Sequence, residues 1–287
     1  MKRIAVLGAN GQLGSDICTV FQEVGWEVVP MNHDLVEVSE LDSVMEALKN
    51  VRPDVLINTA AYHNVESCET NPILAFKVNA LGAKNLCYAC REFGTVLVHV
   101  STDYVFDGHK MEPYLESDKA SPINVYGISK LAGEQFVAAY LERFFIIRVS
   151  GLYGEHPCRA KKGMNFVKLM LKLGKERPEV RVIDDEVLTP TYTLDVAKQL
   201  VELLDTEAFG TYHMTAQGSC SWYGFAKRIF DTAGIRTPLK VASPDEFAGK
   251  APRPKYSVLE NAMLKSIGKD VMPSWEESLE AYLQKLL

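Results

Sequence analysis

The sequence has no long apolar segment. Its most apolar stretches, such as Val96–Val100 and Phe144–Ile147, are far shorter than the roughly 20 residues that a transmembrane helix requires. Residues 1–7 lead into an apolar strand pattern and lack the charged and apolar regions of a secretory signal peptide. We therefore expect a cytoplasmic protein that has no membrane partner.

An excess of basic charge is also missing. Lys and Arg together number 31 and are outnumbered by 37 acidic residues, which gives a formal net charge of −6. A protein that binds the phosphate backbone of a nucleic acid needs a basic surface. We therefore do not expect nucleic acid as a partner.

Patterns of metal ligands and disulfides are absent as well. The 6 cysteines are scattered and include one Cys-x-x-Cys, Cys87 and Cys90, inside the helical pattern 71–92. A redox pair would place its first Cys at a helix N-terminus, and a zinc site would need a second pair. The 6 histidines are isolated in the sequence. The sequence thus predicts reduced thiols and no metal site.

What is present is a regular alternation of strand and helix patterns through residue 150. Strands are expected at 3–7, 27–31, 55–59, 96–100 and 144–149, with helical patterns between them. This alternation predicts an α/β fold with a doubly wound parallel sheet. We expect residues 1–150, joined by parts of 180–215, to form a dinucleotide-binding domain. Residues 151–287 would then form a smaller, discontinuous and mostly helical substrate-binding lobe.

Several local features between these elements can also be predicted. Ser39 is the expected N-cap of the second helix, and Asn71-Pro72 is expected to open a long helix that ends before Gly94. The polar loop 103–121 has the composition of a mobile surface segment.

A glycine-rich turn follows the first strand. Gly8, Gly11 and Gly14 are spaced Gly-x-x-Gly-x-x-Gly and open a helical pattern. In this context glycines permit a tight turn, close approach of a pyrophosphate to the helix N-terminus and close packing of helix on strand. The turn therefore predicts dinucleotide binding. The second strand is followed by Asn32 and His33, which do not decide between NADH and NADPH.

A second constellation lies between residues 101 and 130. Ser101 and Thr102 follow a buried strand pattern, so their hydroxyls should emerge at its carboxyl end. Tyr126 and Lys130 are four residues apart in a helical pattern and should share one helix face. A phenol titrates near pH 10, and a neighbouring ammonium favours the phenolate. The pair therefore suits proton transfer at a reacting oxygen.

Together these motifs make the chain resemble the extended short-chain dehydrogenases/reductases, and more closely the dTDP-4-dehydrorhamnose reductases. The resemblance covers nearly the whole chain, and Ser-Thr-Asp-Tyr-Val-Phe-Asp-Gly at 101–108 is its most specific part. It is also carried by the segments 8–14, 58–62, 126–130, 152–154, 165–167, 189–191, 253–257 and 273–276.

The resemblance implies a role for each matching residue. Tyr126 would be the general acid, Lys130 its pKa modifier and a ribose contact, and Thr102 the residue that polarises the substrate carbonyl. Cofactor contacts, to NADPH or NADH, are expected from Gly8, Asn10, Gly11, Gln12, Leu13, Gly14, Asn32, His33, Ala60, Ala61, Tyr62, Asn79, Tyr126 and Lys130. Contacts to a nucleotide-sugar substrate are expected from His63, Val65, Thr102, Asp103, Tyr104, Gly151, Asn165 and Arg253.

The chain departs from the family pattern on the substrate side. His63 stands where the family usually has Thr, and Gly151 where it usually has Trp. On the cofactor side, Val36 stands where the family often has an Asp for the adenosine end. The basic insertion at 158–162 is largely absent from the family. We expect Gly151 to leave a gap of indole size that a Gly151→Trp substitution would fill.

Three functions agree with this pattern. The first is NAD(P)H-dependent reduction of a nucleotide-linked 4-keto-sugar, dTDP-4-dehydro-L-rhamnose to dTDP-L-rhamnose, by a possible homodimer. The second is a related nucleotide-sugar reductase or epimerase. The third is a non-catalytic, cofactor-binding regulatory subunit that resembles the methionine adenosyltransferase β subunit.

Overall fold

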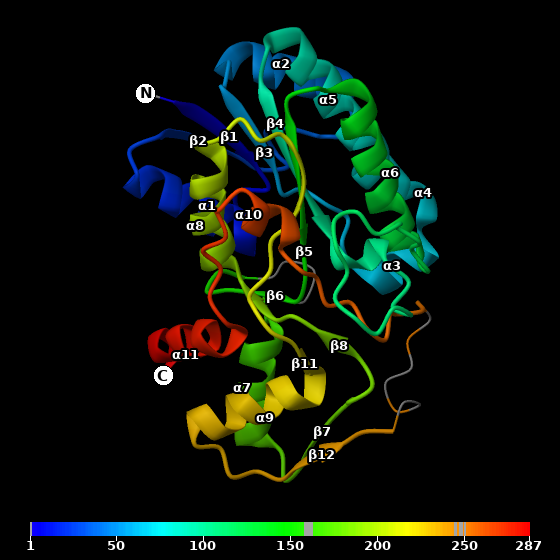
Figure 1. Cartoon of the computed structure of the whole chain (residues 1–287), viewed down its shortest axis with the longest axis vertical. Coiled ribbons are helices and arrows are strands. Elements are labelled where there is room, and N and C mark those ends of the chain that lie inside the picture. Colours follow the sequence, from blue (N-terminus) through cyan, green and yellow to red (C-terminus); the bar gives the residue numbers. More distant parts are fainter. Residues whose placement is uncertain (1, 158–162, 244–245, 247–248, 250) are drawn as a thin grey trace.

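The computed structural model describes residues 2–157, 163–243, 246, 249 and 251–287. Its centre is a parallel sheet of six strands in the order β10-β5-β4-β3-β1-β2 (Figure 1). The order reverses beside β1, and in such sheets ligands bind at the carboxyl edge near the reversal. The strands are β1 (Arg3–Leu7), β2 (Glu27–Met31), β3 (Val55–Asn58), β4 (Val96–Thr102), β5 (Phe144–Val149) and β10 (Gly210–His213).

Helices cover both faces of the sheet (Figure 1), as the alternating strand and helix patterns predicted. One face packs against α1 (Gln12–Glu23) and α8 (Thr193–Leu204) through a core that includes Ile17, Phe21 and Leu200. The other face packs against α2 (Leu41–Val51), α5 (Gly82–Phe93) and α6 (Val125–Tyr140). Successive strand residues alternate between these two cores, which is the period-2 pattern of strands.

A third core lies in the C-terminal part of the chain. It is built by α7 (Phe166–Glu176), α9 (Trp222–Ala233) and α11 (Trp275–Leu286). The predicted capping box at the start of α11 is present: Ser274 Oγ accepts from Glu277 N at 3.2 Å, and the Glu277 carboxylate accepts from Ser274 N at 3.0 Å. The remaining short elements here are β6 (Leu152–Tyr153), β7 (Val180–Val182), β8 (Val187–Leu188), β9 (Thr191–Tyr192), β11 (Cys220–Ser221), β12 (Leu239–Val241) and α10 (Ala262–Ser266).

One local expectation was wrong: Glu40, not Ser39, precedes α2, and it makes no side-chain cap. The long helix expected to begin at Asn71-Pro72 and to end before Gly94 is present as α4 (Pro72–Phe76), a π-helical turn η1 (Lys77–Leu81) and α5, which follow one another without a break. The π-helical turn within it was not expected. A short helix, α3 (Val65–Thr70), had no sequence signal that we recognised.

The segment 103–121 is not simply a mobile surface loop. It starts with the 3₁₀ turn η2 (Asp103–Val105), and Val105, Phe106 and Tyr114 are buried with Leu259 in a small core of their own. Loop composition did not reveal this because the buried partner comes from the far end of the sequence.

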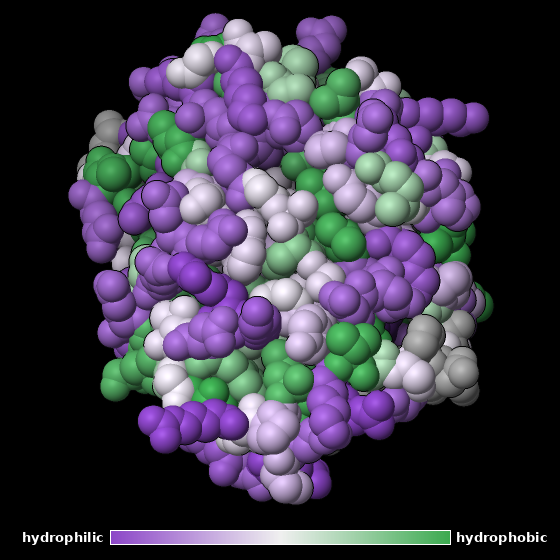
Figure 2. All heavy atoms as spheres, turned by 60° about the horizontal axis from the view of Figure 1, so that its bottom comes forward, coloured by the Kyte–Doolittle hydropathy of each residue, from purple (hydrophilic) through white to green (hydrophobic). Residues whose placement is uncertain are grey.

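The molecular surface is mixed in character. On the face in Figure 2, apolar residues are scattered among polar ones. Within the described residues, no helix is both long and apolar enough to cross a membrane.

Candidate active site

The glycine turn lies between β1 and α1 at the carboxyl edge of the sheet. Gly8 has φ +77°, which favours glycine, and its N–H donates to Met31 O at 2.9 Å. A Cβ on Gly14 would lie 2.3 Å from Gly8 O, so helix and turn approach each other as closely as backbones allow. Gly11 precedes α1 and has no side chain to cap it. The first N–H groups of the helix are therefore suited to a phosphate.

The geometry of this turn fits a dinucleotide pyrophosphate, but the side chains within it differ in what they can contact. Asn10 is exposed, whereas Gln12 Nε2 donates to Gly154 O at 3.3 Å. Leu13 is 5% exposed and belongs to the core, so only its backbone could contact a nucleotide. The predicted contacts at this turn are therefore mainly backbone contacts.

The end of β2 is more acidic than expected. Asn32 Oδ1 accepts from the N–H groups of Asp34 and Leu35, and the exposed His33 ring lies 3.2 Å from the Glu37 carboxylate. Val36, at the position where the family often has Asp, is buried. Sequence reasoning considered Asn32 and His33 and missed Glu37, the carboxylate that lies beside His33.

The segment after β3 is held by a buried amide. Ala60, Ala61 and Tyr62 are half-buried here. Asn79 Oδ1 accepts from Tyr62 N at 2.8 Å, and its Nδ2 donates to Tyr62 O and to Ser129 Oγ, both at 3.0 Å. Asn79 was predicted to contact the cofactor. Its amide fixes this segment through its bonds to Tyr62 and Ser129, and the cofactor contact stays a prediction.

Thr102, Tyr126 and Lys130 come together at the end of β4. Asn124 caps α6 by accepting from Gly127 N at 2.8 Å, and this start of the helix carries both Tyr126 and Lys130. The Tyr126 phenol is hydrogen-bonded to Thr102. Lys130 Nζ donates to Val100 O at 2.6 Å. The predicted constellation is therefore assembled in space.

The protonation of Tyr126 and Lys130 differs from the sequence expectation. Burial raises the pKa of the Tyr126 phenol above its ordinary value, and its hydrogen bond with Thr102 only partly offsets this rise. Burial also lowers the pKa of Lys130 to about 8. We expected the ammonium to lower the pKa of the phenol, but desolvation is the largest effect on the phenol in the protein alone.

Asp103 does not face an open substrate site. It is 4% exposed, and its carboxylate accepts hydrogen bonds from three hydroxyls: Thr102 at 3.0 Å, Ser150 at 2.9 Å and Ser257 at 2.6 Å. The predicted substrate contact is therefore not supported by the geometry of its side chain. Asp103 orients Thr102 instead. To polarise a substrate carbonyl, the Thr102 hydroxyl hydrogen would have to turn away from Asp103.

Tyr104 packs against Tyr126, and the charge of Arg253 acts on Tyr104. The Tyr104 and Tyr126 rings meet edge-on with centroids 5.9 Å apart. Burial raises the pKa of Tyr104, and the charge of Arg253 partly offsets this. Arg253 Nη2 lies 3.3 Å from the carboxylate of Glu66. Arg253 is therefore a cation near Tyr104 that has its own carboxylate partner.

The expected gap at Gly151 is absent. Gly151 has φ +56°, and a Cβ there would lie 2.8 Å from both Leu188 Cδ1 and Thr189 O. The expectation that Gly151→Trp would fill a cavity was wrong, because these neighbours already occupy the space.

Other predicted substrate residues are spread over the fold. Asn165 caps α7 through Lys168 N, and its Nδ2 donates to Gly154 O at 2.7 Å and Tyr282 Oη at 2.9 Å, so no amide hydrogen remains for a sugar. His63 is exposed, and Val65 is the half-buried first residue of α3. The insertion 158–162 lies outside the described residues.

Sequence reasoning missed the polar residues buried behind the site. Asn58 and His99 face each other on β3 and β4, and Ser150 and Ser257 hold Asp103. A polar residue inside an otherwise apolar strand was the available signal for Asn58 and His99. The serines had none, because only tertiary contacts bring them to Asp103.

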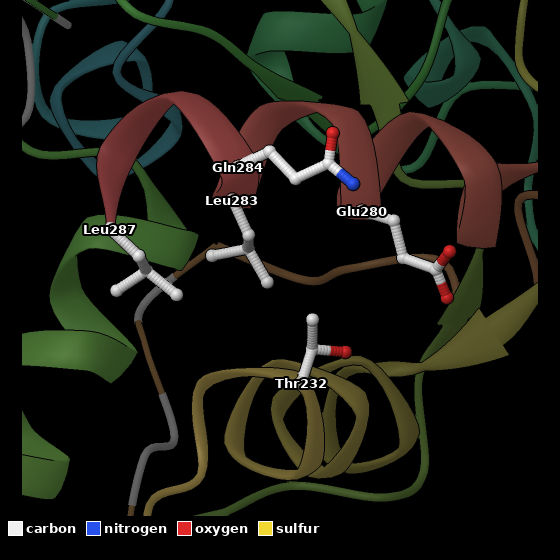
Figure 3. A pocket seen from close by; sticks show the side chains of 5 residues that line it. All are labelled: Thr232, Glu280, Leu283, Gln284 and Leu287. Carbon is white, nitrogen blue, oxygen red and sulfur yellow. The ribbon is translucent and has the colours of Figure 1, made fainter.

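Other features of the described residues do not form this site. They contain no cluster of His, Cys, Asp and Glu that could hold a metal ion. Cys87 and Cys90 are buried in α5, and burial raises the pKa of Cys87 to about 12, so these thiols suit packing. The hollow between α9 and α11 in Figure 3, where Leu283 and Glu280 point toward Thr232, includes none of the predicted site residues.

Comparison with known proteins agrees with this geometry. The family model described as "RmlD substrate binding domain" matches residues 1–287. The chain belongs to this family. It is 36% identical over 286 residues to the spore coat polysaccharide biosynthesis protein SpsK of Bacillus subtilis, covering 99% of this chain and 98% of that protein. It is also 36% identical to a dTDP-4-keto-6-deoxy-D-glucose reductase of Streptomyces niveus, covering 96% and 95% of the two chains.

Solved structures of the family have the same fold over their full length. A dTDP-4-dehydrorhamnose reductase from Clostridium acetobutylicum matches with a TM-score of 0.94 and 41% identity, covering 99% of each chain. One from Bacillus anthracis, in complex with NADP, matches with a TM-score of 0.94 and 41% identity, covering 99% of this chain and 100% of that one.

Proposed function

We propose that this member of the RmlD family is an oxidoreductase that reduces a nucleotide-linked 4-keto-sugar with NADPH or NADH. The observation that carries the proposal is the assembly of Thr102, Tyr126 and Lys130 at the end of β4, on the same sheet edge as the glycine turn. That edge is where doubly wound sheets bind ligands. Relatives named dTDP-4-dehydrorhamnose reductase support the choice of reaction.

Different residues of the chain would bind the cofactor and act on the substrate in such a reaction. The glycine turn and the N-terminus of α1 would hold the pyrophosphate of the cofactor, and Lys130 would hold its nicotinamide ribose. The bound cofactor supplies the hydride. Tyr126 would donate the proton to the carbonyl oxygen of the sugar, and Thr102 would hydrogen-bond that oxygen once its hydroxyl turns from Asp103.

The substrate we propose is dTDP-4-dehydro-L-rhamnose, with dTDP-L-rhamnose as product. The Streptomyces niveus relative, named for a 4-keto-6-deoxy-D-glucose, makes a closely related nucleotide sugar the second candidate. Arg253 would contact the diphosphate, because it is a cation whose charge acts on Tyr104, and Tyr104 packs against Tyr126.

A direct assay tests the proposal. Purified protein is mixed with NADPH or NADH and dTDP-4-dehydro-L-rhamnose, and the loss of absorbance of the reduced nicotinamide is followed. We expect stoichiometric oxidation of the cofactor and formation of dTDP-L-rhamnose. Binding of the cofactor without turnover of dTDP-4-dehydro-L-rhamnose or of the second candidate, a dTDP-4-keto-6-deoxy-D-glucose, would support the regulatory alternative instead.

We also propose how the chain is organised around this reaction. The sheet, with α8 and β10 returning to it, would carry the cofactor, and the core of α7, α9 and α11 would support the substrate side.

A homodimer is proposed because α4 and η1 expose apolar side chains, Ile73 being 84% exposed. Sedimentation of the protein, with Ile73→Glu as the comparison, would test it.

A further inference from the structure

His99 is a buried titratable residue that the proposed reaction does not use. It lies on β4 directly opposite Asn58 of β3, and both project onto the sheet face that α6 covers. His99 is 1% exposed and Asn58 is 3% exposed. Buried polar groups of this kind are normally retained only with partners, so the partners define what the residue does.

The orientation of the Asn58 amide fixes the proton position on His99. Asn58 Oδ1 accepts from Ala60 N at 3.1 Å, which turns Nδ2 toward His99 Nδ1 at 3.1 Å. An amide nitrogen can only donate, so Nδ1 must accept. Burial and the charge of Lys130 hold the pKa of His99 well below its usual range, so the ring is neutral. Its single proton therefore resides on Nε2.

This tautomer directs an N–H group at Lys130. His99 Nε2 lies 3.5 Å from Lys130 Nζ, and Lys130 is itself 1% exposed. An ammonium has three donors and no acceptor, whereas a neutral amine can accept one hydrogen bond. The imidazole therefore favours the amine form of Lys130 while Val100 O fixes the position of its nitrogen.

Few other charged groups act on Lys130. On its own helix, Glu134 raises its pKa, but the Glu134 carboxylate is paired with Arg148 of β5 at 2.7 Å. Tyr126 lies one turn before Lys130 in α6. Asp103 of η2 and Cys68 of α3 act on the phenol of Tyr126. His99 is thus the ionisable residue of the sheet that faces the lysine nitrogen.

We propose that Asn58 and His99 are positioning residues for Lys130: the amide selects the Nε2–H tautomer, and the imidazole N–H directed at the lysine nitrogen limits the protonation of that nitrogen. This inference rests on the proposed function, in which Lys130 serves Tyr126 and the ribose. Its consequence is that the ammonium form, and activity with it, is lost as the pH rises through the pKa of Lys130, which burial lowers to about 8.

The first test is spectroscopic and needs no turnover. Two-bond ¹H–¹⁵N spectra of the histidines report the tautomer, and His99→Leu identifies the His99 signals. We expect an Nε2–H ring that does not titrate between pH 5.5 and 9. An Nδ1–H ring, or a ring that titrates near pH 6.5, would overturn the inference.

The second test reverses the tautomer. Asn58→Asp keeps the shape of the side chain but gives Nδ1 a carboxylate that must accept, so Nε2 becomes an acceptor for the Lys130 ammonium. We expect the Lys130 ¹³Cε titration, assigned with Lys130→Met, to move up by at least about one pH unit, a tenfold change in proton affinity. The alkaline limb of kcat/KM should move with it.

Asn79→Asp is the matched control, because Asn79 is also a buried amide near the site but bonds to Tyr62 and Ser129. It should leave the His99 tautomer unchanged. A switched tautomer in Asn58→Asp with an unmoved Lys130 titration would overturn the positioning role. If the His99 and Lys130 titrations give the expected results but no nucleotide sugar is reduced, the proposed function is wrong and the role of Asn58 and His99 is still supported.

Discussion

The cofactor side and the substrate side of this site are shaped by different parts of the chain. The glycine turn is a backbone structure, in which a Cβ on Gly14 would lie 2.3 Å from Gly8 O. On the substrate side, by contrast, Asp103 and Asn165 are side chains already engaged by protein partners. A backbone requirement leaves a residue pattern in the sequence, whereas a side-chain role depends on partners that only the fold brings near.

The largest effect on cofactor affinity is expected from a change in the glycine turn. Gly14→Ala forces a methyl group against Gly8 O, and such overpacking costs about 1–3 kcal/mol. We expect cofactor affinity, measured by nicotinamide fluorescence, to fall by about tenfold to a hundredfold.

Gly11→Ala is its matched control, because a Cβ there would lie 3.2 Å from Gly8 O and can be accommodated by a small shift. Equal losses in the two variants would show that the close packing of α1 on the turn is not what shapes the cofactor side.

The next effect concerns Thr102. Thr102→Val keeps the shape of the side chain but removes the hydroxyl that bonds Asp103 and Tyr126. Turnover should fall by about 10–100-fold, since one hydrogen bond to the charged, developing oxyanion is lost. Cofactor affinity should be unchanged, and a parallel loss of affinity would argue that Thr102 is structural.

These two sites show how much the sequence could predict. The parallel sheet, the glycine turn and the assembly of Thr102 with Tyr126 and Lys130 followed from spacing along the chain. The roles of Asp103 and Asn165 did not, because Ser257 and Tyr282, which engage them, are more than a hundred residues away. The π-helical turn η1 was also missed, because its residues are ordinary helix formers.

A smaller effect is expected at Gly151. Gly151→Ala should lower the free energy of unfolding by about 1–3 kcal/mol more than Gly25→Ala. Both glycines have positive φ, but only Gly151 has neighbours within 4 Å of an added Cβ. Urea denaturation measures the difference, and equal losses would mean that the space at Gly151 is open after all.

The smallest effect concerns the choice of cofactor. His33 and Glu37 lie together after β2, so a 2′-phosphate would meet both a hydrogen-bond donor and a carboxylate. We expect a preference between NADPH and NADH below about a hundredfold, or 2.7 kcal/mol. Glu37→Gln should shift this preference toward NADPH by less than about tenfold. The preference is measured as the ratio of the kcat/KM values for the two cofactors. A shift toward NADH would exclude this placement of the 2′-phosphate.

The central claim is that Tyr126 donates the proton, and Tyr126→Phe tests it most directly because it deletes one hydroxyl and keeps the ring. Single-turnover oxidation of NADPH with dTDP-4-dehydro-L-rhamnose should slow by about 10²–10⁴, the usual contribution of a positioned acid. Cofactor affinity, measured in the same samples, should change by less than about twofold, since the glycine turn and Lys130 hold the nucleotide. A rate within about twofold of the unchanged protein would contradict the assignment of Tyr126 as the acid.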